Sequence, residues 1–148
     1  MFTQRRCTAV ILSKLINITA KTNPEEYTGI RSDFLLGHSF DSNISLADGC
    51  MKSKDQQNIL GKFRRGDFNI LVATSVVEEG LDVRKCNLVV RFDGMENYRQ
   101  YAQSKGRARA SNSKFMILVP KSDERETQIQ LKVGLHFWSL QHYSEGLT

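Results

Sequence analysis

The sequence is short of several features that would mark a particular class of protein. Its 148 residues include only two prolines and three cysteines, and no apolar run approaches the ~18 residues that a membrane-spanning helix needs. Cys7, Cys50 and Cys86 lie far apart, so neither a disulfide framework nor a zinc site is expected. No small-residue cleavage site follows the apolar residues near the N-terminus, so no signal peptide is expected. We therefore predict a cytoplasmic protein with no membrane partner.

The motifs of a self-contained nucleotide-binding enzyme are missing as well. The chain has no GxxxxGK(S/T) phosphate loop, and no acidic pair follows an apolar strand where it could hold Mg²⁺. It has no GxSxG nucleophile motif, and His38, His136 and His142 do not form a metal-binding set. We therefore expect no metal site in the chain itself and no complete cradle for the phosphates of a nucleoside triphosphate.

The order of apolar and amphipathic segments predicts the fold class. Strands that are apolar on both faces and alternate with helices are typical of a parallel sheet covered on both sides. The fold class is therefore α/β with an open parallel sheet. Only residues 1–4 precede the arginines Arg5 and Arg6 ahead of the first helix, so the first strand is expected to be very short or truncated, and residues 135–148 show no clear pattern. The expected helices are 8–20, 52–65, 98–108 and 123–135, and the expected strands are 34–36, 69–74, 87–92 and 114–119.

What the sequence does contain is a local concentration of positive charge. The net charge is +5, from 21 basic and 16 acidic residues, which permits a nucleic-acid partner. Five basic residues and no acidic one lie between Arg99 and Lys114. Within this stretch Arg107 and Arg109 follow Gly106, and guanidinium groups suit phosphate because they are planar, permanently charged and bidentate. The alternative is a solvated basic helix end, which the helix dipole favours.

A second candidate site follows the expected strand 69–74. Thr74 and Ser75 stand at the strand end, where ligands of doubly wound sheets bind, and hydroxyls there can hold a phosphodiester backbone without reading bases. Asp82 follows Gly80 and could accept hydrogen bonds from sugar hydroxyls. The alternative interpretation is a strand, a tight turn and a cap with no ligand.

Three segments, in this order and at this spacing, resemble the later motifs of superfamily 2 helicases. They are ILVATSVVEEGLDV (70–83), CNLVVRFD (86–93) and YAQSKGRARA (101–110). They are most similar to Dicer and its relatives, and RRCTA (5–9) resembles the start of the same lobe. The resemblance implies a three-layer RecA-like lobe of the P-loop NTPase type, the second of two such lobes. It assigns residues 1–120 to this lobe and leaves 121–148 as a tail that is helical in part.

The resemblance also implies roles for individual residues. Arg107 and Arg109 resemble the motif VI arginines that extend to the γ-phosphate of ATP, where arginine fingers stabilise transition-state charge. The implied partners are double-stranded RNA and the first RecA-like lobe, which would supply the phosphate loop and the Mg²⁺ site, so this chain alone is expected to be inactive. The other matching positions are Gly80, Asp82, Gln103 and Gly106 near the nucleotide, and Thr74 and Ser75 on the RNA backbone.

Two other functions remain open at the level of the sequence. The first is a lobe of a DNA-directed superfamily 2 translocase, because contacts to phosphate carry no sequence information and discriminate sugars poorly. The second is a non-catalytic interaction module that has kept the fold. Both keep the same α/β architecture and differ in what the carboxyl edge of the sheet binds.

Overall fold

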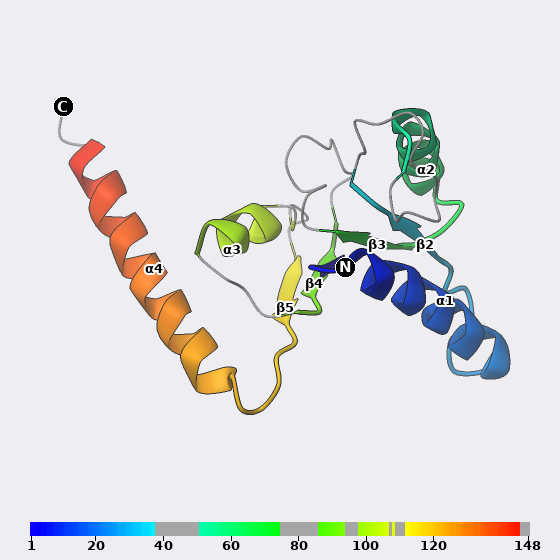
Figure 1. Cartoon of the computed structure of the whole chain (residues 1–148), viewed down its shortest axis with the longest axis horizontal. Coiled ribbons are helices and arrows are strands. Elements are labelled where there is room, and N and C mark those ends of the chain that lie inside the picture. Colours follow the sequence, from blue (N-terminus) through cyan, green and yellow to red (C-terminus); the bar gives the residue numbers. More distant parts are fainter. Residues whose placement is uncertain (38–50, 75–85, 94–97, 107, 109–111, 146–148) are drawn as a thin grey trace.

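The computed structural model describes residues 1–37, 51–74, 86–93, 98–106, 108 and 112–145. Strands and helices alternate along the chain, as the sequence predicts (Figure 1). The elements are β1 (Phe2–Thr3), α1 (Arg6–Thr22), β2 (Ser32–Leu35), α2 (Ser53–Arg65), β3 (Ile70–Thr74), β4 (Leu88–Arg91), α3 (Tyr98–Lys105), β5 (Lys114–Ile117) and α4 (Glu124–Glu145).

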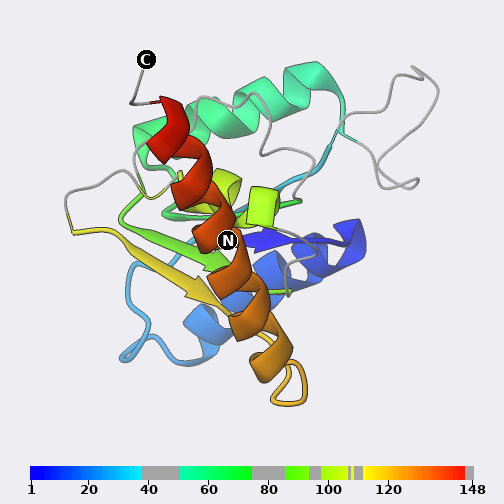
Figure 2. The same ribbon diagram turned by 90° about the vertical axis from the view of Figure 1, so that its left-hand side faces the viewer.

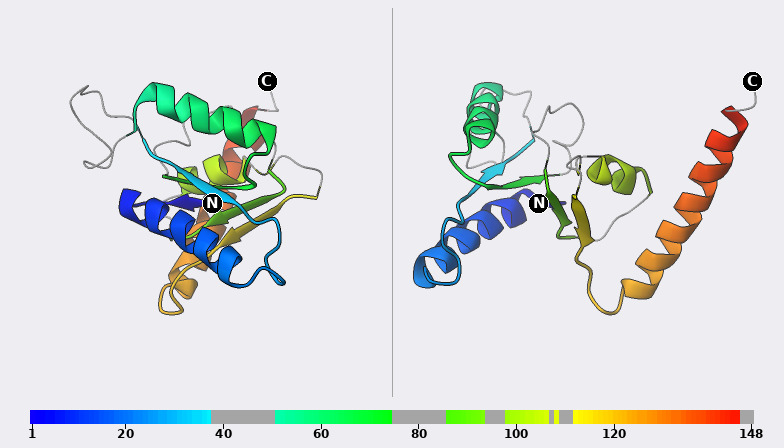
Figure 3. Two further views of the ribbon diagram at one scale, coloured as in Figure 1. Left: turned by 90° about the vertical axis from the view of Figure 1, so that its right-hand side faces the viewer. Right: turned by 180° about the vertical axis from the view of Figure 1, so that it is seen from behind.

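The strands form one parallel sheet in the order β2-β3-β1-β4-β5. The chain runs from β1 outward to β2 and then returns across the sheet, so right-handed crossovers place α1 on one face and α2 and α3 on the other. Figures 1 and 3 show this arrangement, with α1 on the side of the sheet opposite to α2. The predicted α/β class, with an open parallel sheet and helices on both faces, is confirmed.

The shortest strand occupies the centre of the sheet. β1 has two residues and lies between β3 and β4. The Ala73 N–H donates to the Met1 carbonyl and the Phe92 N–H donates to the Phe2 carbonyl, each at 2.9 Å. A two-residue strand therefore connects the two halves of the sheet.

The apolar core lies on both sides of β2 and β3. Helix α1 packs against these strands and β1 from one face, and α2 contacts β2 from the other. A buried amide supports this packing, since the Gln56 side chain donates to the Leu36 carbonyl at 2.6 Å. The buried apolar side chains of the core are Ala9, Leu35, Leu36, Met51, Leu60, Phe68, Leu71, Val72 and Ala73.

The other half of the face that α1 covers is more open. Leu88 of β4 and Met116 of β5 are each 47% exposed, and Leu118 just after β5 is 42% exposed. Their neighbours Val89 and Phe115 point to the opposite face, where α3 lies and Tyr101 meets Phe115 edge to face at 5.3 Å. An apolar strip of the sheet is therefore accessible beside α1.

Helix α1 ends at Thr22, slightly beyond the expected 20, and two other helices end further from the expected residue. Helix α3 ends at Lys105 instead of 108, because the chain turns at Gly106, whose N–H still donates to the Ala102 carbonyl at 2.9 Å. Helix α4 continues to Glu145, through the part of the tail that showed no pattern. It stands apart from the sheet in Figure 1, crosses in front of the sheet in the view of Figure 2, and contacts α3. No helix among the described residues is long and apolar enough to cross a membrane.

Gly66 and Gly61 provide a matched pair of substitutions that tests where α2 ends. Gly66 ends α2 in the left-handed conformation, with φ of 82°, whereas Gly61 lies inside the helix and an added Cβ would meet only Arg65 Nη1 at 3.5 Å. Gly66→Ala is expected to lower the free energy of unfolding by about 1 kcal/mol, and Gly61→Ala to raise it by roughly 0.5–1 kcal/mol. Urea denaturation of both variants measures this, and shifts in the same direction would contradict the assigned helix end.

Candidate functional site

The carboxyl ends of the parallel strands share one edge of the sheet. The connection after β1 runs toward β2, and the connection after β4 runs toward β5. The position between the ends of β1 and β4 is therefore the topological switch point, where open α/β sheets bind their ligands.

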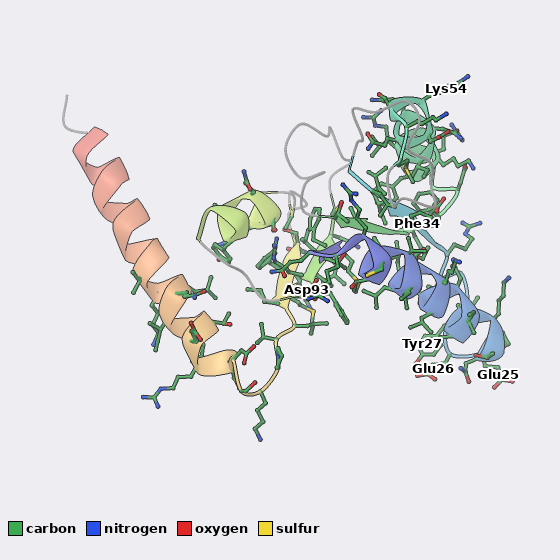
Figure 4. The ribbon with its side chains drawn as sticks, in the orientation of Figure 1. Glu25, Glu26, Tyr27, Phe34, Lys54 and Asp93 are labelled. Carbon is green, nitrogen blue, oxygen red and sulfur yellow. The ribbon has the colours of Figure 1, made fainter. Side chains whose placement is uncertain are left out.

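A hydrogen bond joins the two strand ends at this switch point. The Gln4 N–H donates to Asp93 Oδ2 at 2.7 Å, and the Thr3 hydroxyl donates to the Arg5 carbonyl at 3.1 Å. Figure 4 places Asp93 near the beginning of α1, while Glu25 and Glu26 lie at the opposite end of that helix. The Asp93 carboxylate thus holds the ends of β1 and β4 together.

Thr74 stands at the same edge, at the end of β3, but its side chain is 2% exposed. Its hydroxyl oxygen accepts a hydrogen bond from the Gly37 N–H at 3.2 Å. The hydroxyl therefore joins the end of β3 to Gly37, shortly after the end of β2. In this arrangement Thr74 supports the strand end, and its predicted contact with RNA stays a prediction.

Two of the residues predicted near the nucleotide lie at the end of α3. Gln103 is half-buried in the helix, and Gly106 is exposed just after it. A Cβ added at Gly106 would lie 3.2 Å from the Ala102 carbonyl oxygen, closer than side chains normally approach a carbonyl. Glycine therefore suits this turn. The remaining predicted site residues, Ser75, Gly80, Asp82, Arg107 and Arg109, lie outside the described residues.

Sequence reasoning missed a buried arginine next to this helix end. Arg91 is the last residue of β4 and is 1% exposed, and its Nη1 donates to the hydroxyl oxygen of Ser104, which is fully buried. The signal was present in the sequence, because Arg91 is the one charged residue of the apolar run NLVVRF. A charge in a strand that is otherwise apolar on both faces must be buried with a partner.

The segment after α3 is anchored at Ala108. The Ala108 N–H donates to the Lys105 carbonyl at 3.0 Å, and the Ala108 carbonyl accepts from the Ser113 hydroxyl at 2.8 Å. Lys114, the next residue, begins β5 and donates its N–H to the Asn87 carbonyl at 2.8 Å. No group of three His, Cys, Asp or Glu side chains suited to a metal ion occurs within the described part of the chain.

A known protein family matches most of the chain. Residues 8–111 match the helicase conserved C-terminal domain. The chain belongs to that family. The matched range contains most of α1, all of α2 and α3, and the positions of both predicted arginines.

Relatives of this helicase C-terminal domain include Dicer endoribonucleases. The chain is 44% identical to Endoribonuclease Dicer of Danio rerio over 133 residues. This match spans 89% of this chain and 7% of that protein. It is 43% identical to Dicer-like protein 1 of Aspergillus niger over 136 residues, a match that spans 90% of this chain and 8% of that protein. The chain therefore spans less than a tenth of the length of these relatives, and its resemblance to the C-terminal helicase domain of Dicer-like proteins is confirmed.

Solved structures agree on the fold of the domain. The Mycobacterium smegmatis helicase Lhr, bound to ssDNA and AMP-PNP, superimposes with a TM-score of 0.59 at 22% identity and covers 91% of this chain and 16% of its own. The yeast DEAD-box splicing factor Prp28 gives a TM-score of 0.57 at 22% identity, covering 90% of this chain and 26% of its own. Both support a RecA-like α/β lobe.

Proposed function

We propose that this helicase C-terminal domain is the second RecA-like lobe of a Dicer-like, ATP-dependent cytoplasmic protein that acts on double-stranded RNA. The observation that carries the proposal is the 44% identity to a Dicer endoribonuclease along 89% of the chain. The lobe itself would occupy residues 1–120, with 121–148 as an appended tail. On its own the lobe would not turn over ATP.

The ATP site of this proposal is shared between two lobes. Arg107 and Arg109 would neutralise charge that develops on the γ-phosphate during hydrolysis. Gln103 and Gly106 would lie near the nucleotide. Their place at the end of α3, on a turn that suits glycine, supports this assignment. Gly80 and Asp82 would face the ATP sugar.

The other half of the ATP site would come from the first lobe. That lobe would supply the phosphate loop and the Mg²⁺ ligands, because this chain has no GxxxxGK(S/T) sequence. Exposed Leu88, Met116 and Leu118 fit a lobe that contacts further protein, since large exposed apolar patches mark interaction sites.

The RNA contacts of the proposal are to the backbone and not to the bases. Thr74 and Ser75 would make these contacts, and Thr74, which is buried and accepts a hydrogen bond from the Gly37 N–H, would also hold the end of β3 in place. Such contacts position a strand and carry no sequence information. The identity to Dicer relatives favours RNA over DNA as the partner.

Competition binding tests the proposed partner. The 148-residue chain is expected to bind an RNA duplex weakly and more tightly than a DNA duplex of the same sequence, measured by fluorescence anisotropy. Raising salt from about 50 to 200 mM should weaken RNA binding roughly tenfold, because one lobe engages only two or three phosphates. Equal affinity for the two duplexes would favour a DNA-directed or non-selective lobe, and no binding to either would favour an interaction module.

A further inference from the structure

The strands β4 and β5 are covered on one face and open on the other. Arg91 of β4 and Phe115 of β5 point to the face of α3, where they contact Ser104 and Tyr101. Side chains alternate along a strand, so the residues between them point to the face of α1. There Leu88 and Met116 are each 47% exposed, and Leu118 is 42% exposed.

Helix α1 forms a wall along this open half of the sheet. The Asn17 amide exchanges two hydrogen bonds of 2.8 Å with the backbone of Ser32 in β2, which fixes the rotation of the helix. Leu15 lies about 160° around the helix from Asn17, and Ile11 lies one turn before Leu15. They therefore stand on the flank of α1 that faces away from β2, and they are 51% and 55% exposed.

These five residues make one apolar groove with a floor and a wall. The floor consists of Leu88, Met116 and Leu118 beside α1, and the wall consists of Ile11 and Leu15. We call this surface the β4–β5 groove. Such parallel sheets occur almost only with helices covering both faces, so an uncovered half marks a position for a further helix.

The size of the β4–β5 groove fits one helix. Neighbouring strands lie about 4.8 Å apart, and packed helices lie about 8–10 Å apart, so the width of β4 and β5 beside α1 takes a single helix. A stable interface with a second globular copy needs about 20–30 residues on each side, far more than the groove offers. None of the described helices occupies the groove, since α2 and α3 lie on the opposite face and α4 contacts α3 (Figures 1 and 3).

Charge at the groove adds to the description of its occupant. Lys114 begins β5, pairs in register with Leu88 and is exposed on the same face. It is the one charged side chain that β4 and β5 place on this face. An acidic side chain on the flank of the occupant would therefore complement the groove.

We propose that the β4–β5 groove is the docking site of one amphipathic α-helix from further protein. The helix lies beside α1, presents an apolar stripe to the sheet and directs an acidic side chain to Lys114. The chain spans 7% of the length of the Danio rerio relative, so proteins of this family contain ample further chain to supply such a helix. This inference goes beyond the proposed function, because it requires neither ATP nor RNA.

A designed peptide tests the groove on the 148-residue chain. The probe is a stapled helix of about 15 residues, with leucines spaced three and four apart and glutamates on one flank. It is expected to bind with a Kd of about 10–100 μM by fluorescence anisotropy, because burial of a few leucines is offset by the cost of association. In NMR spectra the amides of Leu88 and Met116 should shift. A peptide of the same composition without the stripe should bind at least tenfold more weakly.

Matched substitutions locate the contact. Met116→Lys and Leu15→Lys are each expected to weaken peptide binding about tenfold or more, because each would bury an unpaired charge. Lys114→Glu should weaken it about threefold, the effect of one exposed ion pair. Ile129→Lys introduces the same charge on α4, where Ile129 is 54% exposed, and should leave the Kd unchanged. Urea denaturation should give the same midpoint for all four variants, since the sites are exposed.

Three results would overturn the proposal. The first is equal binding of the two peptides, or no binding of either. The second is a shift pattern on β2 and β3 in place of β4 and β5, or an effect of Ile129→Lys as large as that of Met116→Lys. The third comes from sedimentation velocity without peptide, where a monomer is expected. A dimer that Met116→Lys dissociates would show that a second copy covers the groove.

Discussion

Arg109→Ala, in an enzyme assembled from this domain and its first lobe, is expected to lower kcat for ATP hydrolysis by about 10³-fold or more. Arginine fingers are worth about 10³–10⁵ in rate because they meet charge that appears on the transferring phosphoryl group. Arg107→Ala should have an effect of the same order. The binding of RNA should change much less, because the proposed role of the arginines is at the nucleotide and not on the RNA backbone. Steady-state hydrolysis with saturating RNA measures the kcat effect.

A charge-matched control makes that result specific. Arg125 is an exposed arginine of α4, so Arg125→Ala removes the same charge far along the chain from the motif. It should leave kcat within about twofold of the unmodified enzyme, the range of a surface substitution. If Arg109→Ala weakens RNA binding while hydrolysis holds, the arginine contacts RNA and its proposed role at ATP is wrong.

Arg91→Ala is expected to cause the largest loss of stability among single substitutions of the described arginines. It deletes a large side chain that is 1% exposed and leaves the buried Ser104 hydroxyl without its guanidinium donor. A cavity of this kind together with the lost bond should cost about 3–4 kcal/mol of the free energy of unfolding. Urea denaturation of the 148-residue chain, followed by circular dichroism, measures the change.

Arg65→Ala is the control for this prediction. Arg65 pairs with Asp67 at 2.8 Å on the surface, where the two side chains are 63% and 46% exposed. An exposed ion pair contributes at most about 1 kcal/mol, so Arg65→Ala should be nearly silent. A loss at Arg91→Ala no larger than the loss at Arg65→Ala would show that the buried bond contributes little to holding α3.

Sequence patterns predicted the alternation of strands and helices well, because each element depends on local signals. The apolar run 69–74 became β3, and the amphipathic segment 52–65 became α2 with Gly66 as its stop. Each of these elements is determined by a few neighbouring residues, namely an apolar run or a left-handed glycine.

Features that depend on distant partners were not predictable in the same way. The pairing of the two-residue β1 on both sides requires β3 and β4, roughly 70 and 90 residues away, to be in place. The Ser113–Ala108 bond depends on the path of the chain between α3 and β5. Helix α4 continues past 135 since no proline interrupts it, although its sequence has no single apolar stripe.

The candidate site shows the same difference between features set by local sequence and features set by distant partners. Residue types and order identified the family, and the RNA contact that they predict for Thr74 stays a prediction, while the fold adds a hydrogen bond from the Gly37 N–H to the Thr74 hydroxyl. A hydroxyl at a strand end can face a ligand or support a neighbouring strand, and only the register of β2 against β3 decides between the two. Arg91 showed the converse, a charge hidden in an apolar run whose partner lies on the next helix.

In the proposed function this domain is one half of an ATP site. The most direct test measures RNA-stimulated ATP hydrolysis twice. The first measurement uses the 148-residue chain alone, and the second uses the chain mixed with a first RecA-like lobe that carries a phosphate loop and an acidic Mg²⁺ motif. We expect no turnover above a protein-free blank for the chain alone, and turnover in the mixture that Arg109→Ala abolishes. Steady turnover by the chain alone, or a mixture whose turnover is the same with Arg109→Ala, would contradict it.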